Sequence, residues 1–579
     1  MSEKNLNNIV STLKQTKPNL KLVNHEQAQP HFVRTINGIS RIAQGKNQPI
    51  EVPITTDGLC PKIKQVVRVF LANGEEEKIR VLQLGKKECR VNSEAWRKPN
   101  TIAREIDRIN HKTGRLITKQ EVYLAEALES LDEKEALVTT EYRFCGWHQG
   151  RFLIPNSPEL EPNETVISDL PYGYCEGNIE LSKEALSTLL STSPSHAALL
   201  FATILLAPLI RPLHLQRFGM YLSARAGTGK TEMLKLLMCV YGNRWSGDEL
   251  LSFAGTTDNA AIKLATSARD LPFPIDNFRP QEGQTPLLKR ITTAAIEGKS
   301  KARLDRLGEF KEQTEIACLP IITGEDFPEG DAGLLGRYLV VDFNSTKRLD
   351  SSKWLHLKRQ IEKNLPMLGK EWISYIQTQL LSKEENEKIE DNYKLILDYW
   401  QKRVKEKGYS SIQNIERIIK HISSLQLAWE LAIKCPIFSE ILGKYSLDFS
   451  NGCIEMLENM IGRNEAKSLG NIAIELLQDA LTTKTVFLQK AGFSISNPSP
   501  RQENLGWQLE DETVHLIPNS FIGWLQKQSA PIFGNLSSKA FYKALEQEGW
   551  IHSRDHKQYT KVIKTDGKTC RILHLRLSK

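Results

Sequence analysis

The pattern of hydrophobic and polar positions changes along the chain, and its first part is rich in strand patterns. Two β-rich runs flank Ala72-Asn73-Gly74, and Asn-Gly between such runs predicts a hairpin. Thr118 with Glu121 three residues later forms a capping box, which predicts a helix start. The pattern predicts an α+β module over residues 31–155. Its expected elements are strands over 63–71 and 78–84, helices over 101–110 and 118–133, and a hairpin over 142–155.

Strand and helix patterns alternate in the middle of the chain, which predicts an α/β core over 181–349. A Pro-punctuated acidic stretch over 156–180 is expected to be a linker, and the polar residues 1–30 are expected to be a mobile tail. The expected core strands are 218–223, 271–276, 317–323 and 338–341, and the expected helices include 182–190, 195–206, 232–241 and 259–268.

The last third begins with helical periodicity over 350–505, where we expect a helical lid and further helices. Residues 506–579 read as a separate domain of two helices followed by a hairpin, which is the order of a winged helix. Ser537 caps the second of these helices and Gly549 closes it. The expected elements are helices over 518–528 and 538–548 and a hairpin over 550–577.

Composition narrows the class of protein. The 579 residues are 40% hydrophobic and 25% charged, as in ordinary globular proteins. Nine cysteines without a C-x-x-C pair argue against a zinc site or a disulfide scaffold. The most apolar run, 197–210, is too short to span a bilayer and contains Pro208. We therefore expect a cytoplasmic protein without membrane contact. The formal net charge of +8 is small for this length, so any nucleic-acid contact should use local basic patches.

A phosphate-binding loop lies between the strand 218–223 and the helix 232–241. Gly227 and Gly229 allow the backbone to curl, so that successive N–H groups point at phosphates. Lys230 can reach the β- and γ-phosphates, and the Thr231 hydroxyl can bind Mg²⁺. The loop matches G-x-x-x-x-G-K-[ST] with alanine at the first position, and its residues are Ala224, Arg225, Ala226, Gly227, Thr228, Gly229, Lys230 and Thr231. The motif predicts binding of ATP with Mg²⁺.

Asp276 ends the apolar run 271–276, where a nucleotide-hydrolysing enzyme needs an acid beside the Mg²⁺. Pro272 and Pro274 lie two residues apart, so both missing N–H groups face the same neighbouring strand. The hydrogen bonds to the strand on the other side can therefore still form. The alternative is that Asp276 is an ordinary loop carboxylate. Asn277 follows, where many related ATPases have glutamate. An amide can orient water but cannot take its proton, so either hydrolysis is slow or another acid is the base.

Two basic segments could contact DNA. If the segment after Gly298 is extended, alternation places cations on one face, which suits a phosphate backbone. A solvated surface ribbon is an equally good interpretation of this segment. The C-terminal hairpin also carries a basic strip, although winged helices bind proteins as well as DNA. The candidate DNA-binding residues are Lys299, Lys301, Arg303, Arg306, Lys539, Lys543, Lys557 and Lys561.

The ordered set of motifs resembles domain-of-unknown-function family 927, a group of helicase-like proteins of phages, plasmids and genomic islands. That family is related to the MCM-like helicases of staphylococcal cassette elements, within the AAA+ ATPases. The resemblance covers about residues 35–440 and is strongest over 215–343. It is carried by the phosphate loop, the following T-T-D-N, L-P-F-P-I-D-N-F-R-P, E-G-K-S-K-A-R, I-I-T-G-E-D, L-L-G-R-Y-L-V-V-D and G-W-x-x-G-x-F-L-I-P at 146–155.

The resemblance implies an α/β P-loop AAA+ ATPase core and assigns roles to individual residues. Arg337 would be the arginine finger, Thr323 the γ-phosphate sensor, and 299–306 the DNA-facing hairpin. Glu325 and Glu282 are the acids that could replace Asn277 as base, and Glu325 is the better candidate because adjacent parallel strands end side by side.

The resemblance also implies a function. We expect a DNA helicase or translocase that forms a ring, a homo-hexamer, and takes part in replication of a mobile genetic element with that element's other replication proteins. The alternative is an ATP-switched initiator or regulator that binds DNA, hydrolyses ATP weakly and unwinds nothing. Asn277 favours the alternative, whereas Arg337 and the basic segment favour the helicase.

Overall fold

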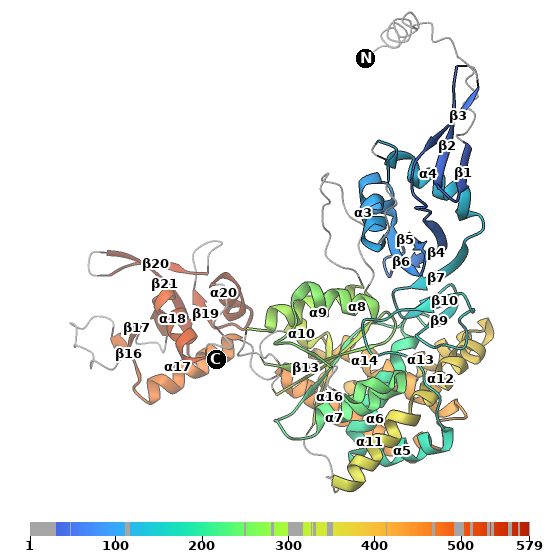
Figure 1. Ribbon diagram of the computed structural model, residues 1–579. Coiled ribbons are helices and arrows are strands. Elements are labelled where there is room, and N and C mark those ends of the chain that lie inside the picture. Colours follow the sequence, from blue (N-terminus) through green and yellow to red (C-terminus); the bar gives the residue numbers. More distant parts are fainter. Residues whose placement is uncertain are drawn as a thin grey trace, which may run out of the picture. The chain divides into compact units, whose positions relative to one another are not determined.

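The computed structural model describes residues 31–577, and its chain divides into two compact units (Figure 1). One unit comprises residues up to 68 together with 77–139, and the other comprises 69–76 and the rest of the chain. Within 31–577 the structure does not describe 47, 111–115, 118, 248–249, 280–282, 299–315, 326, 328–331, 344–350, 413, 466–468, 491–502, 510–512, 530–532, 534–537, 554–558 and 566–567. The expected tail, 1–30, lies outside the described residues.

The first unit packs strands against short helices around a core that includes Ile63, Leu82 and Ile102. The predicted hairpin is present, because β4 and β5 are neighbours in one sheet and Gly74 in their turn has φ +88°. The elements are β1 (His31–Thr35), β2 (Gly38–Gln44), β3 (Pro49–Pro53), β4 (Lys62–Phe70), β5 (Glu76–Leu84), β6 (Lys87–Asn92), α2 (Ser93–Trp96), α3 (Pro99–Ile109), the turn Glu121–Tyr123, α4 (Leu124–Leu128) and η2 (Glu129–Glu133).

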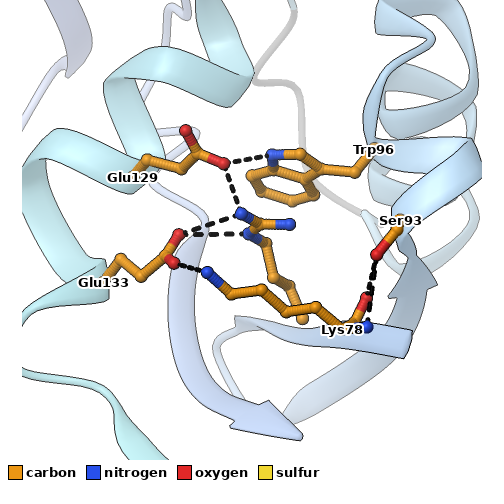
Figure 2. A network of polar contacts seen from close by, with 6 residues as sticks. Lys78, Ser93, Trp96, Glu129 and Glu133 are labelled. Carbon is orange, nitrogen blue, oxygen red and sulfur yellow. Dashed lines mark hydrogen bonds and ion pairs between the residues drawn. The ribbon is translucent and has the colours of Figure 1, made fainter. Parts of the chain in front are cut away.

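The helix predicted over 118–133 begins at Glu121, and its last turn, η2, is a π-helix. Thr118 lies outside the described residues, whereas the Glu121 carboxylate accepts the N–H of Lys119 at 2.8 Å. In η2, Glu129 and Glu133 both accept hydrogen bonds from the buried Arg80 guanidinium of β5 (Figure 2). The same network includes Lys78, which pairs with Glu133, and Trp96, whose Nε1 donates to Glu129 at 2.7 Å. One buried guanidinium therefore fastens the wide last turn to the sheet.

A fully parallel five-stranded sheet forms the centre of the second unit, in the order β12-β13-β14-β11-β15. Figure 1 shows α8 and α9 on one side of this sheet and α6 and α7 on the other, so its middle strands are buried on both faces. The elements are β11 (Gly219–Ser223), β12 (Leu251–Ser252), β13 (Pro272–Phe278), β14 (Leu319–Gly324), β15 (Tyr338–Asp342), α5 (Ile179–Thr192), α6 (Pro194–Leu206), α7 (Lys230–Met238), α8 (Asp258–Ser267), α9 (Thr285–Glu297) and α10 (Ala332–Leu335).

The prolines of β13 do not prevent it from being an internal strand. It pairs with β14 from Pro272 to Phe278 and with β12 through Ile275 and Asp276. Both expectations for this strand are met. Hydrogen bonding to β14 continues past the two prolines, and Asp276 lies near the carboxyl end of β13. The Thr257 cap of α8 is also confirmed, because its hydroxyl accepts the N–H of Ala260.

The stretch 156–180, expected to be a linker, is packed into the core of the second unit instead. Tyr172 and Tyr174 are buried there, and the Tyr172 hydroxyl donates to the carbonyl of Pro272. The preceding hairpin consists of β8 (Gly146–His148) and β9 (Arg151–Leu153), and it packs in the same core. The sequence had assigned this hairpin to the front module. The N–H of Trp147 donates to the buried Asp270 carboxylate at 2.9 Å. Buried aromatic side chains thus convert a proline-rich segment into an ordered one.

Helices dominate residues 351–482, as predicted, whereas β16 (Val486–Lys490), within the range 350–505 expected to be helical, is a strand. Helices α14 and α16 pack against α6 and β15. The last helix, α17, contributes Ala473 and Leu477 to a C-terminal core that extends to Leu575, whereas the sequence placed the domain boundary at 506. The helices before it are α11 (Ser351–Asn364), α12 (Pro366–Tyr375), α13 (Lys383–Glu406), α14 (Ile415–Lys434), α15 (Ser439–Lys444), α16 (Ser446–Glu465) and α17 (Leu469–Thr482).

In the C-terminal region α17 packs on α20, and a sheet runs in the order β16-β17-β18-β21-β19. The predicted two helices and hairpin are present, and β20 pairs with β21 in that hairpin. The elements are β16 (Val486–Lys490), β17 (Glu503–Gln508), β18 (Thr513–Leu516), α18 (Pro518–Gln528), α20 (Ser538–Gln547), β19 (Ile551–Ser553), β20 (Lys561–Thr565) and β21 (Lys568–Arg576). Ser537, the expected cap of the second helix, lies outside the described residues.

Candidate nucleotide-binding site

The phosphate loop connects the central strand β11, which ends at Ser223, to α7, which begins at Lys230. Gly227 and Gly229 have φ +79° and +89°, which only glycine adopts without strain. Because a Cβ on Gly227 would meet no atom within 4 Å, glycine is needed there for its backbone conformation and not for space. The outer loop, Arg225 to Gly227, is exposed, and the Thr228 hydroxyl donates to the carbonyl of Arg225 at 3.1 Å.

Lys230 directs its ammonium group back across the loop, where Nζ donates to the carbonyl of Ala224 at 2.9 Å. The residue is only 9% exposed, although its side chain carries a charge. Burial lowers the pKa of Lys230, while the carboxylates of Asp276 and Glu325 act in the opposite direction. A buried cation that donates to one backbone carbonyl can exchange that carbonyl for phosphate oxygens, so the loop fits a triphosphate.

Asp276 gathers two hydroxyl groups at the carboxyl edge of the sheet. Thr231 donates to Asp276 Oδ1 at 2.9 Å, and Thr323, at the end of the adjacent strand β14, donates to the same oxygen. A hydroxyl and a carboxylate side by side at a helix start are oxygen ligands of the kind that Mg²⁺ prefers. The structure therefore brings together Thr231 and Asp276, the two residues predicted to hold the metal, with Thr323, the predicted sensor, and Asp276 is not an isolated loop carboxylate.

Asn277 lies in a β-bulge that the sequence does not reveal. The register of β13 against β14 shifts between Ile275 and Phe278, and Asn277 takes φ +63°. Its N–H donates to the Thr323 hydroxyl at 3.2 Å, and its Oδ1 accepts Nε of Arg279 at 3.1 Å. Bulges next to a site aim a side chain in a new direction. Asn277 is therefore held from both its backbone and its side chain.

Glu325 immediately follows β14 and is exposed. Its carbonyl accepts the Ser223 hydroxyl at 3.0 Å, which ties it to the end of the phosphate-loop strand. The other acid considered for the role of base, Glu282, lies outside the described residues. Glu325 thus borders the same edge of the sheet as Lys230 and Asp276.

Arg337 lies at the opposite edge of the sheet. It precedes β15, whose first residue, Tyr338, is paired with Gly219, the first residue of β11. The phosphate loop follows the other end of β11, about 15 Å away at about 3.3 Å per residue. Arg337 faces Glu297 of α9, with 3.7 Å between the guanidinium and the carboxylate. Arg337 therefore lies too far from the phosphate loop of its own chain to contact a nucleotide bound there.

The candidate DNA-binding residues are only partly described. Lys299, Lys301, Arg303, Arg306 and Lys557 lie outside the described residues, and Lys539 and Lys543 lie on α20 without described side chains. The described residues on either side of 299–315 are hydrogen-bonded to each other, because the Ile316 N–H donates to the carbonyl of Gly298 at 3.0 Å. Lys561 lies on β20, half-buried, with Nζ 3.5 Å from the Ser553 hydroxyl.

Two residues near the site, Arg279 and Gln284, escaped the sequence-based reasoning, as did Glu297, which faces Arg337 at the other edge of the sheet. Gln284 precedes α9 and its side-chain oxygen accepts the N–H of Arg279 at 2.8 Å. The signal that could have found Arg279 is its place two residues after Asn277 at a strand end. Within the described part of the chain no group of three His, Cys, Asp or Glu side chains is arranged to hold a metal ion. No helix among those residues is long and apolar enough to cross a membrane.

Comparison with known proteins supports the family resemblance. Residues 73–315 match the family described as Domain of unknown function (DUF927), which confirms the resemblance over that stretch. No curated protein is significantly similar to the chain. The solved structure "SCCmec type IV Cch - active helicase" is similar with a TM-score of 0.55 and 15% identity, over 94% of this chain and 97% of that one. The structure of the "NrS-1 C terminal region-CTR" matches 88% of this chain and 96% of its own at 12% identity, with a TM-score of 0.29.

Proposed function

We propose that this chain is an ATP-dependent DNA helicase or translocase of the ring-forming AAA+ type that acts in replication of a mobile genetic element. The observation that carries the proposal is the convergence of Lys230, Thr231 and Asp276 at one edge of the parallel sheet. Strand β14 lies between the phosphate-loop strand and the acid strand, in the order that AAA+ ATPases have. The fold shared with a structure titled as an active helicase supports the same proposal.

The nucleotide site divides its tasks among residues of this chain. The loop amides and Lys230 would bind the β- and γ-phosphates, and Thr231 with Asp276 would hold Mg²⁺, which neutralises phosphate charge. Glu325 would take the proton of the attacking water, since Asn277 cannot. Arg337 would stabilise the charge that develops on the nucleotide of the neighbouring subunit.

The C-terminal region supports DNA binding through its topology and its surface charge. Its two helices α18 and α20 precede the paired strands β19, β20 and β21, which is winged-helix order. Arg571 and Arg576 of β21 are exposed. Exposed cations on a hairpin beside a recognition helix suit phosphate contacts.

ATP turnover and strand separation, measured together, test the proposed function. A helicase should hydrolyse ATP faster when single-stranded DNA is added, and it should separate a forked duplex only with ATP and Mg²⁺. If the rate of ATP turnover is the same with and without DNA and no strands are separated, the second candidate is favoured, an ATP-switched DNA-binding initiator or regulator. The observation that favours this candidate is Asn277, which stands where a general base is expected.

Complementation between two inactive variants tests the role of Arg337. Arg337→Ala and Lys230→Ala should each be inactive alone, because every interface then lacks one partner. In an equal mixture that exchanges freely, about a quarter of the interfaces should combine an intact loop with an intact finger, and turnover should rise accordingly. Arg359→Ala, which removes an exposed arginine of α11, should stay active by itself. A mixture that stays inactive despite exchange would count against a shared site.

Removal of the C-terminal region tests its contact with DNA. Because its core begins at Ala473, the truncation should follow Glu465 and not fall within the sheet. The truncated protein should bind duplex DNA more weakly, with a log–log salt slope reduced by about one per lost phosphate contact. Arg571→Ala should lower the slope by about one, whereas Lys527→Ala should change it less because Lys527 pairs with Glu503 at 2.7 Å. An unchanged slope after truncation would identify a protein-binding module instead.

A further inference from the structure

The hydrogen bonds of Thr323 leave it without a donor for a phosphate. A threonine hydroxyl has one hydrogen and two lone pairs. Its hydrogen goes to Asp276 Oδ1, and one lone pair accepts the N–H of Asn277 at 3.2 Å. Phosphate oxygens accept hydrogen bonds and need a donor. Thr323 is also 0% exposed, so a ligand could reach it only after displacing its neighbours. The sensor role suggested by the resemblance therefore needs another residue.

The side-chain amide of Asn277 can supply the hydrogen-bond donor that Thr323 lacks, and the orientation of this amide is fixed. Arginine carries only donors, so the Asn277 atom 3.1 Å from Arg279 Nε must be the amide oxygen. The amide nitrogen, with two hydrogens, is then the end left for a ligand. Asn277 is half-buried at the carboxyl edge of β13, directly after the acid that accepts the Thr231 hydroxyl.

The backbone fixes both members of this pair. Asn277 has φ +63°, a region that asparagine tolerates better than most residues. Its N–H is bound by Thr323, and the N–H of Arg279 is bound by the side chain of Gln284 at 2.8 Å. Gln284 is itself 9% exposed. The two side chains thus meet at an anchored bulge, which accounts for an asparagine at this position.

We propose that the amide nitrogen of Asn277 is the donor that recognises the terminal phosphate of ATP, and that Arg279 is the positioning residue that orients this amide. The inference rests on the proposed ATP-binding function and deepens it, because it names the group that distinguishes a nucleoside triphosphate from a diphosphate. Asn277 detects the phosphate, and Glu325 remains the base.

Equilibrium binding tests the proposal without reliance on turnover. The dissociation constants of ADP and of a non-hydrolysable ATP analogue, each with Mg²⁺, are measured on the full chain. Asn277→Gly removes the amide and keeps the left-handed backbone. It should therefore weaken binding of the ATP analogue about tenfold or more and leave binding of ADP unchanged. Asn277→Asp preserves the shape of the side chain but places a carboxylate opposite the phosphate. It should weaken binding of the ATP analogue further.

Arg279 supplies the readout that separates orientation from folding. Arg279→Ala should lower the ATP-over-ADP preference in part, Arg279→Lys should restore some of it, and Arg279→Ala should add nothing to Asn277→Gly. A preference that survives Asn277→Gly, or that Arg279→Ala lowers further in the Asn277→Gly background, would overturn the proposal.

Lys230→Ala distinguishes the failure of this inference from the failure of the proposed function. If that variant binds both nucleotides as tightly as the unaltered protein, the loop is not the nucleotide site and the proposed function falls. If Lys230→Ala binds neither nucleotide while Asn277→Gly still prefers ATP to ADP, only the inference about Asn277 is refuted.

Discussion

Replacement of Lys230 by alanine should abolish ATP turnover while the protein stays folded. The ammonium group is the cation of the phosphate loop, and loss of one preorganised group of this kind costs a factor of about 10²–10³ or more in rate. In the free protein the Lys230 ammonium donates one hydrogen bond to the carbonyl of Ala224, and its loss should lower the free energy of unfolding by about 1 kcal/mol. Turnover, nucleotide affinity and the thermal unfolding midpoint are the quantities to measure.

Lys235→Ala is the matched control for this experiment, because Lys235 is the other lysine of the same helix and lies five residues further along it. It should retain turnover, since its side chain does not lie in the phosphate loop. Unchanged turnover in Lys230→Ala would remove the central claim about the site, whatever the control shows.

Glu325→Gln should reduce turnover by about 10²–10⁴-fold and leave nucleotide binding intact. Glu325 follows the strand beside the phosphate loop, and its carboxylate lies within electrostatic reach of the Lys230 ammonium, whose pKa it raises. Glutamine keeps the size of the side chain and removes only the ability to accept a proton. Single-turnover hydrolysis and the dissociation constant of ATP separate these two effects.

The outcome at Glu325 decides between two views of the site. Normal turnover in Glu325→Gln, together with a severe loss in Asn277→Gly, would show that the amide itself positions the attacking water. A severe loss in Glu325→Gln, with an altered ATP-over-ADP preference in Asn277→Gly, would support the division into a base and a phosphate sensor.

Position 277 shows where sequence and structure give opposite predictions. From the sequence alone, Asn277→Glu restores a missing base, so turnover should rise or stay unchanged. In the structure that glutamate would adopt φ +63°, at a cost of about 1–2 kcal/mol, and would lose the phosphate donor. The structure therefore predicts lower stability and weaker ATP binding for this variant.

Local sequence was enough to predict the phosphate loop and the elements around it. Glycines at fixed spacing, a lysine and a threonine lie within eight consecutive residues, so the conformation of the loop depends little on distant parts of the chain. The same holds for the Asn-Gly hairpin, the Thr257 cap and the buried strands, whose patterns follow from periods of two and of about 3.6 residues. Asp276 was placed beside Thr231 because the strands of a parallel sheet end at the same edge.

Only the tertiary structure decided features that depend on contacts between distant residues. Packing of Tyr172 and Tyr174 turned an expected linker into part of the core, and the helix α17 joined the C-terminal region through its buried face. Strand register placed Arg337 away from the phosphate loop of the same chain. The bulge at Asn277 arises from one extra residue against β14, and no local pattern announces it. Sequence thus determined the chemistry available, and packing and register determined which groups meet.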